Sequence, residues 1–179
     1  IEQWLKYASP ESLSLYMYQN PKRAKKLYAD VVPKAVDEYL SCIDKFTTED
    51  SKQKLLNPVW HIHSGNPPKE KSIMPFSVLL NLVGTSNATD KNVLWKFIKK
   101  NKKNINPSDH PILDSLVGYA LKYFTDIVQP KKKYRKPNEK EKKELQDLVS
   151  RLQKCKSDTE PESIQTIVYS VGKDNGYSE

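Results

Sequence analysis

Cysteine and long apolar runs are both scarce in this sequence. Only two cysteines, Cys42 and Cys155, occur among 179 residues, which is too few for the disulfide framework of a small secreted domain. No apolar run approaches the roughly 20 residues that a membrane-spanning helix needs, and no signal peptide opens the chain. The sequence therefore predicts a cytoplasmic protein that keeps its thiols reduced and has no membrane partner. Because it begins at Ile1, we expect it to be a piece of a longer protein.

Patterns typical of catalysis are missing as well. The five glycines form no phosphate-cradling loop, and we find no Ser/His/Asp set and no paired carboxylates on one helix face. No segment alternates between apolar and polar residues over the length of a strand. We therefore expect an all-α fold, built as a multi-helix bundle, with no catalytic residue.

Positive charge is abundant and unevenly distributed. The chain has 30 Lys and Arg against 22 Asp and Glu, a formal net charge of +8. Residues 91–143 hold 15 basic and 5 acidic groups, whereas the rest of the chain holds 15 basic and 17 acidic ones. A concentrated positive field indicates a polyanionic partner, and for a helical protein without an amphipathic membrane helix we favour nucleic acid.

Helix-start signals and apolar spacing predict helices along most of the chain. Ser9, Pro10 and Glu11 combine an N-cap, a first-turn proline and an acid near the positive end of the helix dipole. Asn138 should cap a highly charged helix, and Thr89 or Asp90 another. The expected helices cover residues 9–20, 22–31, 33–46, 76–83, 90–100, 106–130, 138–155 and 161–171, with a short turn ending near residue 56.

Residues 57–75 form the one long irregular segment, because four prolines and Gly65 exclude a continuous helix. His61 and His63 in this segment could suggest a metal pair or an adenylate-binding signature. A zinc site needs three or four ligands, and such a signature should follow a strand and open a helix. We therefore predict no metal site here, and expect hydrogen bonds of the two histidines to order the loop. Direct RNA contact is the second option, with these candidates: Trp60, His61, His63 and Asn66.

Two basic clusters are candidates for phosphate binding. The first basic cluster comprises Lys22, Arg23, Lys25 and Lys26. The second basic cluster comprises Lys131, Lys132, Lys133, Tyr134, Arg135 and Lys136. Cations around one tyrosine can bind a nucleic-acid backbone and stack a base. For each cluster, the alternative is a solvated surface turn or linker.

The sequence also carries a family resemblance. The run IEQWLKYASPESLSLYMYQNPKRAKKLYADVVPKAVDEY (residues 1–39) resembles the segment after the KMSKS-type loop of class I, archaeal-type lysyl-tRNA synthetases. The resemblance continues through NPVWHIHSGNPP (57–68), MPFSVLLNLVGTSNATDKNVLW (74–95), DHPILDSLVGYALKYF (109–124) and ESIQTIVYSVGKDNGY (162–177). These blocks occur in the order of the family and cover nearly the whole chain.

The resemblance implies a parent enzyme that joins lysine to tRNA(Lys), using ATP with Mg through a lysyl-adenylate. The nucleotide-binding sheet and both signature motifs would lie upstream of Ile1, so this part alone should be inactive and hold no cofactor. Its partners would be tRNA(Lys) and the upstream catalytic domain of the same chain. Its fold would be the helical cage of the C-terminal region, with connecting stem-contact helices over residues 1–46 and an anticodon-side domain over 47–179.

By the same resemblance, the first basic cluster would meet phosphates on the inner side of the tRNA, and the second would lie where unpaired bases can stack on Tyr134. Two other classes remain open from the residues themselves. One is a free-standing helical RNA- or DNA-binding module, and the other is a helical protein-interaction scaffold with an acidic partner.

Overall fold

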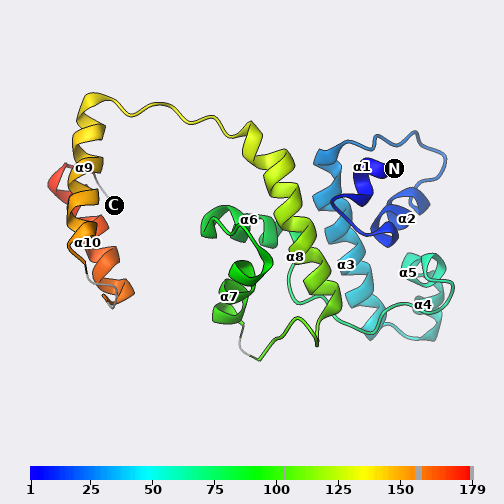
Figure 1. Ribbon diagram of the computed structural model, residues 1–179. Helices are drawn as coiled ribbons and strands as arrows, with labels where there is room; N and C mark the ends of the chain where they lie inside the picture. Colours follow the sequence, from blue (N-terminus) through cyan, green and yellow to red (C-terminus); the bar gives the residue numbers. More distant parts are fainter. Residues whose placement is uncertain (103, 156–158, 178–179) are drawn as a thin grey trace. The chain divides into compact units, whose positions relative to one another are not determined.

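The structure is a computed structural model that describes residues 1–102, 104–155 and 159–177. These residues form ten α-helices and no β-strand (Figure 1), which confirms the all-α prediction. The α-helices are α1 Glu2–Leu5, α2 Pro10–Tyr18, α3 Val32–Thr48, α4 Ser51–Leu56, α5 Pro58–Ile62, α6 Phe76–Ser86, α7 Lys91–Asn101, α8 Pro111–Tyr123, α9 Glu139–Gln153 and α10 Pro161–Asp174. Short 3-10 turns cover η1 Ala29–Val31 and η3 Gln129–Lys131, and a π-helical turn covers η2 Phe124–Val128.

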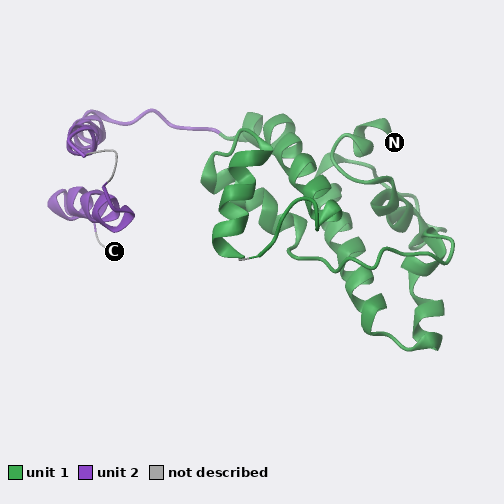
Figure 2. Ribbon diagram, turned by 60° about the horizontal axis from the view of Figure 1, so that its bottom comes forward, with its two compact units in different colours: residues 1–132 green, residues 133–179 purple. Residues whose placement is uncertain are grey.

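The chain divides into two compact units, unit 1 from Ile1 to Lys132 and unit 2 from Lys133 to Glu179 (Figure 2). The division that the resemblance implied, between residues 46 and 47, falls inside α3. That division concerned the roles of the two parts, and it stays a prediction.

Unit 1 is built around α3, which spans 17 residues. Apolar side chains recur along one face of this helix and are buried, among them Val36, Tyr39 and Ile43. Helices α2, α5 and α6 pack against α3, and α6 also packs against α8. Phe76 and Leu79 of α6 are completely buried between these neighbours. The core of unit 1 is therefore a set of short helices arranged around two longer ones.

Unit 2 is a helical hairpin of α9 and α10. Its only buried side chain among residues 133–155 and 159–177 is Val171, while Leu145, Val149 and Val168 are about half exposed. The Arg151 guanidinium joins the two helices through Asp147 at 2.8 Å and Asp174 at 3.0 Å. Polar contacts thus complement a small apolar interface in this unit.

Three helix caps follow the sequence prediction. The Ser9 hydroxyl accepts a hydrogen bond from the Ser12 amide, the Asp90 carboxylate caps α7, and Asn138 forms a capping box with Glu141. Each of these side chains lies within three residues of the amide that it binds, so the sequence alone identifies the pair.

Two further helices begin without a side-chain cap of their own and receive one from a distant residue. Asp37 of α3 accepts hydrogen bonds from the Phe76 amide at 2.5 Å and the Ser77 amide at 3.3 Å. Glu70 accepts one from the Ile112 amide of α8 at 3.0 Å. A carboxylate at a helix N-terminus satisfies free amides and complements the helix dipole.

The helix predicted over residues 22–31 is wrong. Residues 22–28 are irregular, and only η1 is helical, as a single 3-10 turn. Asn20 adopts a left-handed conformation (φ 52°) that ends the helical path before Pro21. Four cations in five positions disfavour a helix here by mutual repulsion, and the side chains of Tyr16 and Lys25 bind the loop instead.

Three other boundaries also differ from the prediction. Residues 58–62 form the short helix α5 inside the segment expected to be irregular, because Asn57 caps it and Pro58 is tolerated in its first turn. Helix α8 begins at Pro111, several residues after the expected start. Its α-helical part ends at Tyr123, before Pro130, where the π-helical and 3-10 turns continue the path. None of the described helices is long and apolar enough to cross a membrane.

We predict that Asp37→Ala lowers the free energy of unfolding of unit 1 by about 1–2 kcal/mol, because it leaves two amides of α6 without their charged acceptor. Urea denaturation followed by tryptophan fluorescence measures this, since Trp4, Trp60 and Trp95 all lie in unit 1. Glu38→Ala makes the same charge change one residue later and should have a smaller effect. Equal effects of the two substitutions would contradict the capping role.

Candidate nucleic-acid interface

The first basic cluster lies on the loop between α2 and η1. Lys22, Arg23 and Lys26 are exposed, and no acidic side chain of the described part of the chain forms an ion pair with them. The Arg23 amide binds the Asn20 carbonyl at 3.1 Å, which fixes the start of the loop. Three cations therefore project into solvent from one short segment.

Lys25, the fourth cation of this cluster, has a different role. Its ammonium donates to the Tyr16 carbonyl at 2.7 Å and lies 4.5 Å from the centre of the Tyr16 ring. The Tyr16 hydroxyl in turn donates to the Lys26 carbonyl at 3.2 Å. A cation over an aromatic ring is favourable, so Lys25 and Tyr16 hold the loop in place beside the end of α2.

The second basic cluster belongs to both units. In unit 1, the Lys131 ammonium lies 3.1 Å from the Asp30 carboxylate, and Lys132 lies 4.7 Å from the centre of the Phe124 ring. In unit 2, the Tyr134 side chain is 81% exposed. Lys133 and Lys136 are exposed too, and neither forms an ion pair within residues 133–155 and 159–177.

Arg135 is bound within unit 2. Both of its terminal nitrogens donate to the two carboxylate oxygens of Glu141, and Glu141 also accepts from the Asn138 amide at 2.8 Å. The Arg135 hydrogen bonds, followed by the one from Asn138, lower the pKa of Glu141 to about 2. Glu141 therefore joins the segment before α9 to the first turn of that helix.

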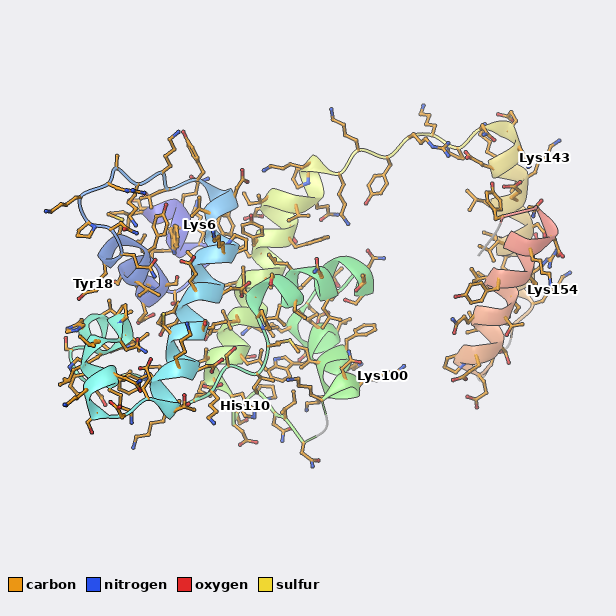
Figure 3. All side chains as sticks on the ribbon, turned by 180° about the vertical axis from the view of Figure 1, so that it is seen from behind. Lys6, Tyr18, Lys100, His110, Lys143 and Lys154 are labelled. Carbon is orange, nitrogen blue, oxygen red and sulfur yellow. The ribbon has the colours of Figure 1, made fainter. Side chains whose placement is uncertain are left out.

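Hydrogen bonds and ring contacts hold helix α5 and the turn after it, where His61 and His63 lie. The Nε2 atom of His61 lies 2.8 Å from the Leu55 carbonyl, and its ring stacks on Tyr18, which is labelled in Figure 3. The Trp60 ring stacks on Phe46 with centroids 6.1 Å apart. Gly65, in a left-handed conformation (φ 84°), approaches Trp60 so closely that a Cβ would lie 3.1 Å from the indole.

His63 faces a cavity of about 390 Å³ in unit 1, together with Asn66. Its Nε2 atom lies 3.0 Å from the hydroxyl of Tyr39, a buried residue of α3. Burial lowers the pKa of His63, partly offset by the carboxylate of Glu11. Glu11 and Tyr39 were not connected with His63 in the sequence analysis, because both lie on helices far from it along the chain.

A groove of about 590 Å³ in unit 2 is lined by Tyr134 and Arg135 and by apolar side chains of α9 and α10. Tyr177 also lines it and donates a hydrogen bond to the Glu144 carboxylate at 2.8 Å. These last two residues were not among the sequence candidates. Tyr134 and Tyr177 thus place two aromatic rings on the wall of one groove.

Candidate metal ligands do not come together in the part of the chain that the structure describes. No group of three His, Cys, Asp or Glu side chains there could hold a metal ion. Cys42 and Cys155 are both free thiols, and burial raises the pKa of the Cys42 thiol.

Comparisons with known proteins show which proteins the chain is similar to. The family model described as tRNA synthetases class I (K) matches residues 1–66. The first part of the chain is therefore related to the class I tRNA synthetases.

Relatives of the whole chain narrow this relationship to lysine–tRNA ligases. The ligase of Roseobacter denitrificans is 45% identical over 174 residues, which are 97% of this chain and 33% of that protein. The ligase of Rickettsia peacockii is 45% identical over 179 residues, 99% of this chain and 34% of the relative. The chain spans about a third of the length of these relatives and matches their C-terminal part, so the resemblance seen in the sequence is confirmed. No solved structure matches the chain with significance.

We predict that the contribution of His63 to the stability of unit 1 falls as the pH is lowered. Burial depresses the pKa of the folded state below the ordinary value of 6.5, so the unfolded chain binds the proton first and acid favours unfolding. The stability contributed by neutral His63 is therefore present above about pH 6.5 and is lost as pH falls through the folded pKa.

The comparison of wild type with His63→Gln between pH 7.5 and pH 5 isolates this residue from other titrating groups. The difference in unfolding free energy, measured by tryptophan fluorescence in urea, should shrink toward the acidic end. A difference that grows at low pH would show that the protonated form is the one stabilised in the folded chain.

Proposed function

We propose that this chain is the tRNA-binding helical portion of a class I lysine–tRNA ligase, whose whole protein attaches lysine to tRNA(Lys). The observation that carries this proposal is the 45% identity to lysine–tRNA ligases over 97–99% of the chain. The basic surface and the absence of catalytic motifs in the sequence support the same role. The upstream catalytic domain would bind ATP and Mg, and we expect the protein to act in the cytoplasm.

Phosphate neutralisation by the first basic cluster is the central step of the proposed binding. Lys22, Arg23 and Lys26 are exposed cations on a loop that Lys25 and Tyr16 hold in place. Lysine and arginine that contact phosphates release counterions, which favours binding and makes it depend on salt. We assign these contacts to the tRNA stem, and extend the stem-contact role to residues 1–46.

Stacking is the proposed contribution of the second basic cluster. Tyr134 exposes its ring beside Lys133 and Lys136, and single-stranded bases stack on exposed aromatic side chains. Arg135 is occupied by Glu141, so we assign it to holding this segment rather than to a phosphate. Residues 47–179 would accordingly serve the anticodon side.

We predict that replacing Lys22, Arg23 and Lys26 together by Ala weakens the binding of all tRNAs alike. Each lost phosphate contact should reduce the slope of log affinity against log salt by roughly one unit. Binding of the 179-residue chain to tRNA across a salt series measures the slope. Replacing Lys52, Lys69 and Lys71, three exposed lysines elsewhere in unit 1, changes the charge equally and should leave the slope nearly intact. An equal loss in both variants would indicate a nonspecific charge effect.

A second prediction concerns Tyr134. Tyr134→Ala should reduce the preference for tRNA with the cognate anticodon over an anticodon-swapped tRNA, with stacking worth about 1–3 kcal/mol per base. Tyr169→Ala is the matched control, because Tyr169 of α10 is also exposed, at 62%. If Tyr134→Ala keeps full discrimination while the salt slope is unchanged, residues 131–136 are only a solvated linker.

A further inference from the structure

The cavity beside His63 has the size and lining of a binding site. It measures about 390 Å³ and is bounded by α2, α3, α8 and residues 63–68. Small-molecule pockets of proteins are mostly apolar and hold a few converging polar groups. Its apolar wall includes Val36, Leu40, Pro68, Pro111 and Leu116.

The pair of Tyr39 and His63 forms the polar end of this wall. Burial raises the pKa of the Tyr39 phenol and lowers that of the His63 imidazole, so both are neutral at pH 7. The Tyr39 hydroxyl lies 3.0 Å from Nε2 of His63, and the two side chains share a hydrogen bond.

Three more polar side chains of the cavity have no partner among the residues that the structure describes. The Glu11 carboxylate, the side-chain amide of Asn66 and the Tyr119 hydroxyl all line it, and none of these side chains hydrogen-bonds or ion-pairs with another group of the described residues. Glu11 is only partly exposed. Tyr119 is half-buried as well, whereas Asn66 is exposed. A ligand that hydrogen-bonds with these side chains would take the place of water at them.

The chemistry of these groups selects the ligand. A lone carboxylate disfavours phosphate and favours an N–H donor. Asn66 both donates and accepts, while the rings of Tyr39 and Tyr119 and two prolines provide flat apolar surfaces. An alkylammonium ion carries only donors, so it would leave the N–H donors of the Asn66 side chain without an acceptor. A planar heterocycle with an amino group beside a ring nitrogen offers both a donor and an acceptor, and its flat faces match the apolar surfaces.

We propose that this cavity binds a heterocyclic base through its amino-bearing edge, with the Glu11 carboxylate accepting a hydrogen bond from the exocyclic amino group. Cytosine, adenine and guanine carry such a group, and uracil does not. Two sources could supply the base, an unpaired nucleotide of RNA or a free nucleoside. Only the RNA source depends on the tRNA-binding function proposed above.

The test compares cytosine with uracil, because these two bases have nearly the same size. Labelled hexamers of C and of U are titrated with the 179-residue chain by fluorescence anisotropy at several salt concentrations. Cytidine and uridine are titrated into the isotope-labelled chain and followed by NMR. We expect the C hexamer to bind roughly tenfold more tightly than the U hexamer, as for one good base-edge pair, and cytidine to shift resonances of cavity residues.

Two variants inside the cavity and one outside it complete the design. Glu11→Gln should abolish the preference for C without changing the salt slope, and Tyr119→Phe, which removes only a hydroxyl, should reduce it. Glu38→Gln makes the same charge change as Glu11→Gln on a residue that does not line the cavity, so it should keep the full preference. Urea denaturation confirms that each variant is folded.

The two arms distinguish the source of the base. Selectivity of the hexamers together with shifts at the cavity supports an RNA base, and selectivity of the nucleosides alone supports a free small molecule. Equal binding of C and U in both arms overturns the proposal. So does a preference that survives Glu11→Gln and Tyr119→Phe, or a cavity that responds to n-butylamine but not to cytidine. Loss of all salt-dependent RNA binding would contradict the proposed tRNA-binding function alone. The nucleoside titration does not depend on that function, so it would still test the cavity.

Discussion

Carboxylates in unit 1 accept hydrogen bonds from free backbone amides at the N-termini of helices that are distant in the sequence. The rest of the unit depends on these contacts. Asp37 of α3 binds the first amides of α6, and Glu70 binds the first turn of α8. Asp44, two turns after Asp37, accepts a hydrogen bond from the Ser72 amide at 2.7 Å. Each bond joins an ionised acceptor to a backbone donor that the fold would otherwise leave free, and such bonds are stronger than neutral ones. The segment that links α5 to α6 is thereby attached to the central helix along its length.

This attachment explains how a segment rich in proline and poor in secondary structure can form one wall of a cavity. Asn66 and Pro68 line the cavity, and Ser72 and Phe76, further along the segment, are hydrogen-bonded to carboxylates of α3. Prolines reduce the number of conformations that the unfolded segment can adopt, so ordering it costs less. At its other end, Gly65 allows the backbone to turn directly over Trp60. The apolar core and the polar caps therefore act together, since the caps set where the chain runs and the core fixes the helices.

The sequence predicted the features that depend on neighbouring residues and failed where distant ones decide. The caps at Ser9, Asp90 and Asn138 involve side chains within one turn of the helix, and all three are confirmed. Asp37 caps a helix 39 residues away, and no local pattern marks it. The helix predicted after Pro21 was wrong. The apolar spacing suggested it, but hydrogen bonds of the Tyr16 and Lys25 side chains to backbone carbonyls hold this segment as a loop. The cavity could not be predicted, since its lining joins α2, α3 and α8 only after folding.

The cations of the two basic clusters look equivalent in the sequence, but contacts with other residues of the folded chain distinguish them. Lys25, Lys131, Lys132 and Arg135 contact a carbonyl, a carboxylate or an aromatic ring of their own unit. A cation held in this way must give up an existing contact before it can bind phosphate, and an exposed pair contributes little to stability in return. Cations without such contacts need only lose rotamer freedom and water. Binding energy should therefore be concentrated in Lys22, Arg23 and Lys26 on the loop that Lys25 orders, because a fixed backbone lowers the entropy that each of these contacts would cost.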